Sequence, residues 1–363
     1  MNVVSSIVRT AVGALFIFSG LIKINDPVGM AIKMEEYFEV FSADFSSIFH
    51  SLVPIALQIA VFICVLEVVL GLALILNYRT SVTFISTLLL ILFFTGLTFY
   101  SAYFNKVTDC GCFGDAIKLT PWQSFYKDVV LTVLIVFILV FSTTLQSAAA
   151  QKISDYIMIA AVVISTGLAI YAIEHLPFID FRAYKTGNNI AEEMQPSADY
   201  IYEYIMEKDG KEFVFDSYPT DESYTYKELK LVNPEAQPKI TDYAVWNDDG
   251  DFTESTFEGN KLFLILYNVA KTDKDSFSDI NKLIDALGNE VEVYALTASD
   301  ADTYNSFSEE VGLKVPFYYT DATVLKTITR SNPGLWLLQD GTVKGKWHYN
   351  DVPTLYDIQG LLD

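Results

Sequence analysis

The sequence predicts a mixed fold: an N-terminal all-α transmembrane four-helix bundle with a fifth transmembrane helix, then a C-terminal α/β thioredoxin-like domain. Of the 363 residues, 52% are apolar, and the long apolar runs are confined to residues 1–178. That part carries 8 Lys and Arg against 11 Asp and Glu, whereas the remainder carries 16 against 34. From residue 240 onward, strand-like and helix-like segments alternate. The acidic second part argues against nucleic acid and anionic lipid surfaces as partners.

Five stretches are long and apolar enough to cross a bilayer as helices, which takes about 20 residues each. They are residues 5–22, 53–77, 82–104, 124–142 and 154–176. The first stretch lacks a small-residue cleavage site, so we interpret it as a retained span and not as a cleaved signal peptide.

Basic residues in short loops predict the orientation of these spans. Arg9, Arg79 and Lys152 fall on one side, which we therefore expect to be cytoplasmic. The loops 23–52 and 105–123 and the whole C-terminal half then lie outside the cytoplasm. Four lysines in the opposite loops weaken this signal, namely Lys23, Lys33, Lys106 and Lys118.

The loop 23–52 has apolar residues at helical spacing, with Met34, Tyr37, Phe38 and Phe41 on one face. This pattern predicts a helix, either amphipathic and lying at the membrane interface or packed as a connector.

Composition divides the chain into four segments: a membrane bundle (1–145), a fifth transmembrane helix (146–178), a linker with a small β-hairpin (179–239) and the α/β domain (240–363). The start of the linker is polar and contains Pro and Gly, and its hairpin is expected to turn at Asp209-Gly210.

The α/β domain begins with a buried strand at 261–269, a helix at 275–287, a second strand at 291–298 and a second helix at 300–313. A hairpin that turns at Asp340-Gly341 and a helix at 353–362 end the chain. This order is that of a thioredoxin-type domain.

In such domains the redox cysteines follow the first central strand, where the helix dipole stabilises a thiolate. Here that place reads NVAKTDKDS (268–276), and no cysteine follows residue 112. The domain alone cannot exchange thiols for disulfides. Pro333 is expected to follow a cis peptide bond and is a peptide-binding candidate. The alternatives are a binding domain and a purely structural one.

Two of the three cysteines, Cys110 and Cys112, flank a single glycine between two apolar stretches. A disulfide across one residue is hard to close with ideal geometry, and strained, exposed disulfides are labile. Such a bridge restrains almost no chain and therefore adds little stability. The pair thus suits thiol–disulfide exchange, and we predict it as the catalytic pair.

Two other interpretations of this pair remain open: a pair of buried thiols in a packed turn, and a soft-metal site. Two thiolates alone are too few for a metal, and all three histidines are distant in sequence, so no metal ligands are assigned.

Inside the second span, Glu67 is an ionisable residue that costs roughly 2.5–3.5 kcal/mol to insert, so it should face the bundle with a partner. Candidate partners are Arg9, Lys23 and hydroxyl groups such as those of Thr95 and Tyr100. Glu67 either forms part of a proton or quinone site or makes an internal structural hydrogen bond. Cys64, one turn away, suits a small apolar position in the helix.

Three segments resemble the DoxX and MauE group of small four-helix membrane proteins: RTAVGALFIFSGLIKINDP (9–27), LEVVLGLALILNYRT (66–80) and CGCFGDAIKLTPWQSFYKDVVL (110–131). The resemblance covers residues 5–142 and implies a bundle distantly related to disulfide-forming membrane enzymes of the vitamin K epoxide reductase type. It implies that Cys110 and Cys112 are the redox pair, while Arg9, Lys23 and Glu67 match polar positions without an assigned role.

The whole arrangement also resembles Gram-negative bacterial DoxX-domain proteins with a C-terminal redoxin-like domain, which implies an inner-membrane protein with its C-terminal domain in the periplasm. Enzymes of the epoxide reductase type use two cysteine pairs, and this chain has one pair and an isolated Cys64.

Two functions remain open. The first is thiol–disulfide exchange at the extracytoplasmic Cys-Gly-Cys with a quinone as electron acceptor. The second is a non-catalytic anchor or assembly factor, whose acidic domain binds a periplasmic protein. A quinone needs an aromatic-lined cavity in the bundle beside the cysteines, whereas the core of a plain anchor would be filled by side chains.

Overall fold

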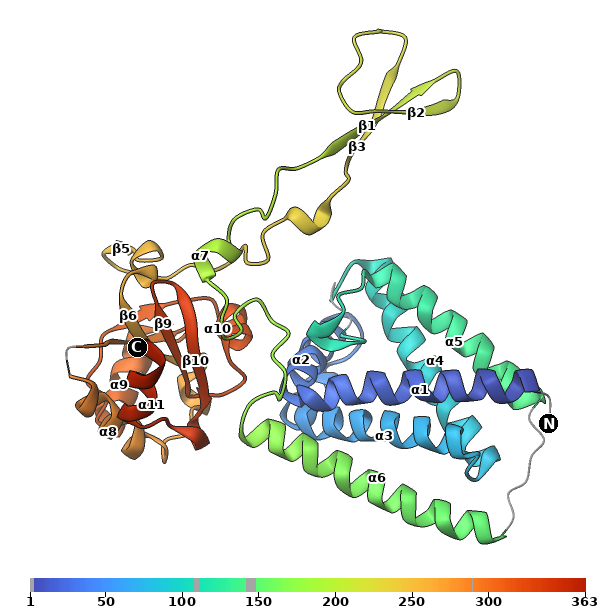
Figure 1. The fold of residues 1–363 in the computed structure, drawn as a ribbon, viewed down its shortest axis with the longest axis horizontal. Helices are drawn as coiled ribbons and strands as arrows, with labels where there is room; N and C mark the ends of the chain where they lie inside the picture. The colour runs from blue at the N-terminus through green and yellow to red at the C-terminus, as the bar shows by residue number, and fades with distance from the viewer. Residues whose placement is uncertain (1–2, 108–110, 142–147, 289) are drawn as a thin grey trace. The chain divides into compact units, whose positions relative to one another are not determined.

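The protein, seen here as a computed structural model, is described at residues 3–107, 111–141, 148–288 and 290–363 (Figure 1). It divides into two compact units, Met1–Arg182 and Ala183–Asp363.

The first unit is helical. Its elements are α1 (Val3–Asn25), α2 (Pro27–Asp44), η1 (Ser47–Ile55), α3 (Ala56–Leu76), α4 (Thr80–Phe104), η2 (Gly114–Ala116), α5 (Pro121–Phe141) and α6 (Ala148–Glu174). Within the described residues, five helical stretches are long and apolar enough to span a membrane: α1, η1 with α3, α4, α5 and most of α6. All five predicted spans are therefore confirmed as helices.

Local signals in the sequence set several helix ends. Asp26 caps α2 by accepting a hydrogen bond from the Gly29 amide at 2.8 Å, and Pro27 occupies the first turn. Asn77 and Asn105 adopt the left-handed conformation, with φ of 55° and 52°, and end α3 and α4.

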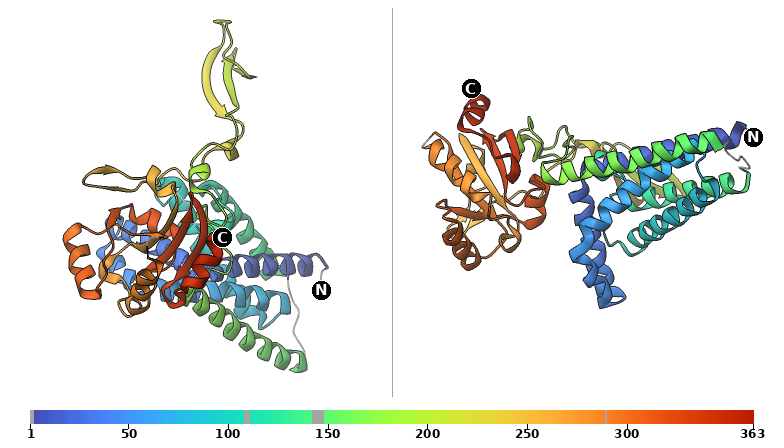
Figure 2. Two further views of the ribbon diagram at one scale, coloured as in Figure 1. Left: turned by 60° about the vertical axis from the view of Figure 1, so that its left-hand side comes forward. Right: turned by 90° about the horizontal axis from the view of Figure 1, so that it is seen from below.

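The helices pack as two close pairs, α1 with α3 and α4 with α5, and α1 also contacts α5 (Figure 1). Helix α6 lies along α3 and α1, so the fifth span packs against the bundle (Figure 2). The shared core is apolar and includes Phe16, Leu74 and Ile135.

Helix α2 confirms the helix predicted in the loop 23–52. Its apolar face is turned into the unit: Met34, Tyr37 and Phe38 are buried, and the Tyr37 hydroxyl lies 2.7 Å from Ser101 Oγ. This burial favours the packed connector over an amphipathic helix exposed to lipid on its apolar face.

The second unit contains a seven-stranded sheet in the order β10-β9-β6-β7-β8-β4-β5. Its strands are β4 (Trp246–Asn247), β5 (Gly250–Asp251), β6 (Asn260–Leu266), β7 (Glu292–Thr297), β8 (Phe317–Tyr319), β9 (Gly334–Gln339) and β10 (Thr342–His348). Its main helices are α8 (Phe277–Leu287), α9 (Ala301–Val311), α10 (Ala322–Ile328) and α11 (Leu355–Leu362). The remaining short turns are α7 (Ile190–Glu193), η3 (Pro234–Ala236), η4 (Glu254–Phe257), η5 (Val269–Lys271) and η6 (Tyr349–Asp351).

Strand β6 is buried on both faces, which explains its continuous apolar run. Leu262 and Leu264 pack with α8, α9 and α11 on one face, whereas Phe263 and Ile265 pack with α10 on the other. Strand β6 is parallel to β7 and antiparallel to β9, which is antiparallel to β10. This order is that of the thioredoxin fold, as predicted.

A separate three-stranded antiparallel sheet precedes this domain, with β1 (Tyr202–Lys208) between β2 (Lys211–Phe215) and β3 (Thr225–Leu231) (Figure 2). The hairpin at Asp209-Gly210 is confirmed, and β3 was not predicted. Tyr184 and Ile190, which composition placed in the linker, pack in the core around β6 and β9.

Candidate functional site

Glycines allow α1 and α3 to approach closely. A Cβ atom at Gly71 would lie 2.6 Å from the carbonyl oxygen of Gly13, and one at Gly20 would lie 2.6 Å from Val68 Cγ2. Small residues at a helix interface permit this backbone contact within membranes. The contact brings the last turns of α1 beside the middle of α3.

Three polar side chains meet where these two helices touch. Lys23 Nζ on α1 lies 2.5 Å from Glu67 Oε1 on α3, and both side chains are about 95% buried. Ser19 Oγ lies one turn before Lys23, 3.0 Å from Glu67 Oε2. Glu67 therefore has a cation on one oxygen and a hydroxyl on the other, as a buried carboxylate requires.

The same serine contacts the loop that holds Cys112, which connects α4 to α5. Ser19 Oγ lies 3.1 Å from the carbonyl oxygen of Cys112. Gly111 and Gly114 have φ of 62° and 52°, conformations that a side chain would strain, so the tight turn around Cys112 depends on glycine. Cys112 is half-buried. Cys110 lies outside the described residues.

A second buried carboxylate lies on α5. Asp128, which is 1% exposed, accepts a hydrogen bond from Thr98 Oγ1 of α4 at 3.1 Å and lies 2.8 Å from Lys127 Nζ. Lys127 Nζ also lies 5.0 Å from the centre of the Phe113 ring, next to Cys112. Helices α4 and α5 are thus fixed to each other beside the loop.

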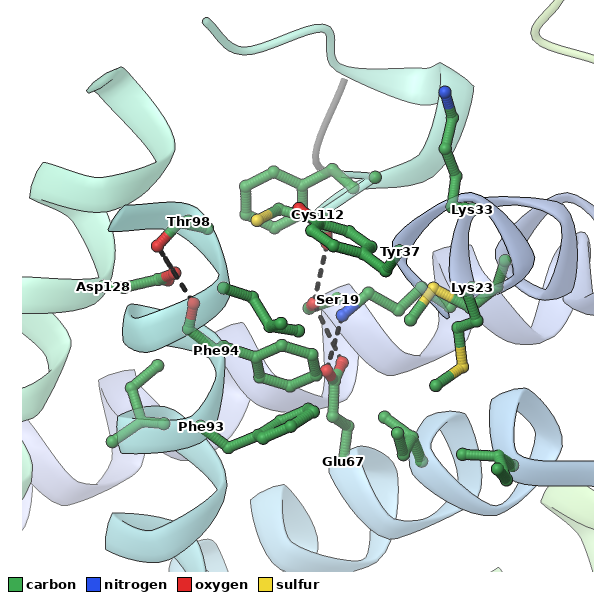
Figure 3. Close-up of a pocket in the computed structure, with 18 of the residues that line it drawn as sticks. Ser19, Lys23, Lys33, Tyr37, Glu67, Phe93, Phe94, Thr98, Cys112 and Asp128 are labelled. Atoms are coloured by element: carbon green, nitrogen blue, oxygen red, sulfur yellow. Dashed lines mark hydrogen bonds and ion pairs between the residues drawn. The ribbon is translucent and has the colours of Figure 1, made fainter. Parts of the chain in front are cut away.

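These groups surround a cavity of about 310 Å³ inside the bundle. Figure 3 shows Lys23, Glu67 and Ser19 meeting at its centre, Cys112 above them, and Thr98 with Asp128 to one side. Most of the wall is apolar, and its aromatic residues are Phe16, Tyr37, Phe38, Phe41, Phe49, Phe93, Phe94 and Phe113. The volume falls at the lower end of small-molecule sites, roughly 300–1,000 Å³.

The predicted residues are brought together only in part. Lys23, Glu67 and Cys112 line one cavity. Arg9 is buried but precedes Lys23 by 14 residues, about 21 Å along α1, so it is not the partner of Glu67. The two hydroxyls considered as partners bond elsewhere: Thr95 to the carbonyl of Ile91 and Tyr100 to Asp44.

Cys64 is fully buried in an apolar cluster with Ile24 and Ala169, outside the lining of the cavity. This position fits its interpretation as a small apolar residue. The described residues contain no group of three or more His, Cys, Asp or Glu arranged for a metal ion.

Sequence reasoning missed Ser19, Thr98 and the role of Asp128 in the cavity. Serine and threonine in apolar spans are common, so only the fold singles these two out. The Lys-Asp pair at 127–128 did carry a signal, because two charges close to the start of an apolar stretch need partners.

In the second unit, the peptide bond before Pro333 is cis, as predicted. Pro333 lies between Asn332, whose side-chain Nδ2 donates to the carbonyl of Asn268 at 2.8 Å, and strand β9. The segment 268–276 therefore lies beside the proline, as in thioredoxin folds, but without cysteines. Peptide binding at Pro333 stays a prediction.

The fold and the site define a multi-pass membrane protein with an aromatic-lined, polar-centred cavity in its helical unit, followed by an α/β domain. Residues 1–141 match the family of methylamine utilisation protein MauE, which supports a MauE-type membrane unit. Protein TlpB of Flavobacterium psychrophilum is 27% identical over 157 residues, 42% of this chain. The chain spans about 40% of the length of that relative. No solved structure matches the chain.

Proposed function

We propose that this protein is a bacterial inner-membrane thiol oxidoreductase: Cys110 and Cys112 exchange electrons with thiols of a periplasmic protein and pass them to a quinone in the cavity. The observation that carries the proposal is the aromatic-lined cavity directly beside Cys112. A plain anchor would fill this space with side chains, because protein interiors are close-packed. The MauE-type match of residues 1–141 supports a redox-associated role in the membrane.

The chemistry balances with two half-reactions. A client dithiol reduces the Cys110–Cys112 disulfide, so the client gains a disulfide and the pair gains two S–H bonds. The pair then reduces a quinone: two S–H bonds break, one S–S bond forms, and two O–H bonds form on the ring. Quinone is the cofactor this scheme needs, and the aromatic wall suits its flat ring.

The charges of the cavity favour a neutral occupant. Lys23 is balanced by Glu67 and Lys127 by Asp128, while Lys33 pairs with Glu36 at 3.4 Å. An anionic or cationic ligand would leave one charge uncompensated in an apolar surrounding, which is costly. A quinone adds no charge and offers two carbonyl acceptors.

In this proposal the topology is the one that the basic residues of the short loops favour, with the Cys112 loop and the α/β domain in the periplasm. In that compartment disulfides persist. The α/β domain then recruits the client, and Pro333 is its candidate peptide-binding residue.

A second function deserves a direct test because the α/β domain has no cysteine. In that alternative the protein is a non-catalytic membrane anchor, and its acidic domain binds a periplasmic partner.

The deciding experiment is a redox titration of full-length protein in nanodiscs, followed by thiol alkylation. We expect a reversible two-electron transition that Cys112→Ser abolishes and Cys64→Ala leaves unchanged, because Cys64 packs in an apolar cluster away from the cavity. Reduced protein should then reduce decylubiquinone or menadione. Cysteines that never oxidise, or a bridge that no buffer reduces, would favour the anchor.

A further inference from the structure

The lysine in the cavity has hydrogen-bonding capacity left over. An ammonium group has three N–H donors. Among the described residues, Glu67 Oε1 is the one hydrogen-bond acceptor of Lys23 Nζ, at 2.5 Å. The cation also lies 4.8 Å from the centre of the Phe94 ring, which lines the cavity. Figure 3 shows the amine end of Lys23 inside the cavity, between Glu67 and Ser19.

Burying this ion pair inside the membrane-spanning unit costs free energy, which indicates that the pair has a function. Both side chains are about 95% buried in a membrane-spanning unit. Ionisable groups at such depth are costly, and functional sites are their usual location. Glu67 stabilises the ammonium, and the close contact of α1 with α3 fixes the distance between the two residues.

Lys23 also lies near the cysteine that would deliver electrons. Ser19 contacts Glu67 and the Cys112 carbonyl, so the pair and the loop share one side chain. A ring that occupies the cavity beside Cys112 would place a carbonyl oxygen within reach of the remaining Lys23 donors. Phe94 and Phe93 line the same space and can pack against such a ring.

Building on the proposed function, we propose that Lys23 is the catalytic acid of the quinone step and that Glu67 is its positioning residue. As two electrons leave the thiols, a quinone carbonyl oxygen gains negative charge and takes a proton from Lys23: an N–H bond breaks and an O–H bond forms. The amine then takes one of the two protons released by the thiols, and the second ring oxygen takes the other. Lys23 ends the cycle unchanged.

Two substitutions of Lys23 separate binding from proton transfer. Lys23→Met removes the charge and the donor, and general acid catalysis typically contributes 10²–10⁴-fold, so we expect the quinone reduction rate to fall about 100-fold or more. Lys23→Arg keeps a cation and donors, but arginine does not lose its proton in proteins. We expect Lys23→Arg to keep KM for decylubiquinone within about threefold while kcat falls as in Lys23→Met.

The matched control is Lys106→Met, which breaks a lysine–aspartate contact with Asp44 outside the cavity. It should leave kcat and KM unchanged. Lys23→Met alone leaves the Glu67 carboxylate buried without its cation, which can prevent folding. The double variant Lys23→Met/Glu67→Gln removes both charges and keeps the test valid if the single variant does not fold.

The measurements are steady-state quinone reduction by the full-length protein in nanodiscs, with excess dithiothreitol as the dithiol electron donor, and quinone binding by calorimetry. Full kcat in Lys23→Arg, or in the folded double variant, would overturn the role of Lys23 as acid while leaving the proposed function intact. If the wild-type protein neither binds nor reduces decylubiquinone and menadione, the proposed function itself is wrong.

Discussion

The contact between α1 and α3 makes a sharp prediction about Gly71. In Gly71→Ala the new methyl would lie 2.6 Å from the Gly13 carbonyl oxygen and 2.8 Å from the Ile17 amide nitrogen. Ordinary contacts begin at 3.4 Å, so the two backbones must separate by roughly 0.8 Å. Both obstacles are backbone atoms, which cannot rotate away as a side chain can.

The cost follows from two opposing terms. Overpacking a close interface costs about 1–3 kcal/mol, whereas replacing a helical glycine by alanine returns up to about 1 kcal/mol. We therefore expect Gly71→Ala to lower the free energy of unfolding by about 1–2 kcal/mol. Glu67 lies one turn before Gly71 on α3, so the same separation should also lengthen its contact with Lys23.

Gly96 provides the matched control. It lies in α4, and a Cβ atom there would meet nothing within 4 Å. Gly96→Ala should therefore be neutral or slightly stabilising. Unfolding by SDS in mixed micelles, followed by circular dichroism, measures both variants. Equal stability of Gly71→Ala and Gly96→Ala would refute the close-contact argument.

Two further predictions concern hydrogen bonds outside the cavity. Asp300 caps α9 by accepting from the Thr303 amide at 2.9 Å, and this bond, with one from the Thr303 hydroxyl, holds the pKa of Asp300 below its ordinary value. Asp300→Ala should speed amide hydrogen exchange in the first turn of α9 about fivefold at neutral pH. Because the folded pKa is the lower one, this stabilisation is present above pH ~4 and is lost as the pH falls through the folded pKa, so wild type and variant should converge in acid. Asn25 holds the chain after α6 through two hydrogen bonds to the Ile179 backbone, at 2.8 and 2.9 Å. Asn25→Ala should weaken this attachment by about 1–3 kcal/mol. An unchanged rate of hydrogen exchange at the Ile179 amide would contradict this prediction.

Much of the fold could be predicted because it rests on local patterns. The five apolar helices, the hairpin at Asp209-Gly210 and the alternating elements after residue 260 follow from apolar periodicity and turn residues. The two-residue strands β4 and β5 could not be predicted, since they are too short to show a period.

The candidate site was predictable only where a residue is anomalous by itself. Glu67 and Lys23 were identified because charge in an apolar span needs a partner, and the structure pairs them. Ser19 and Thr98 are ordinary residues in a span. They matter only because the helices place them against Glu67 and Asp128, and a single sequence does not contain that information.

Ser19 has one hydroxyl hydrogen but two acceptors within 3.1 Å, the Glu67 carboxylate and the Cys112 carbonyl. It can donate to one of them at a time. The Glu67 carboxylate, which is paired with Lys23, is the stronger acceptor and takes the hydrogen. The serine thus shares a single hydrogen between the ion pair and the backbone carbonyl of Cys112, so the loop that holds Cys112 is held less firmly while the carboxylate takes that hydrogen.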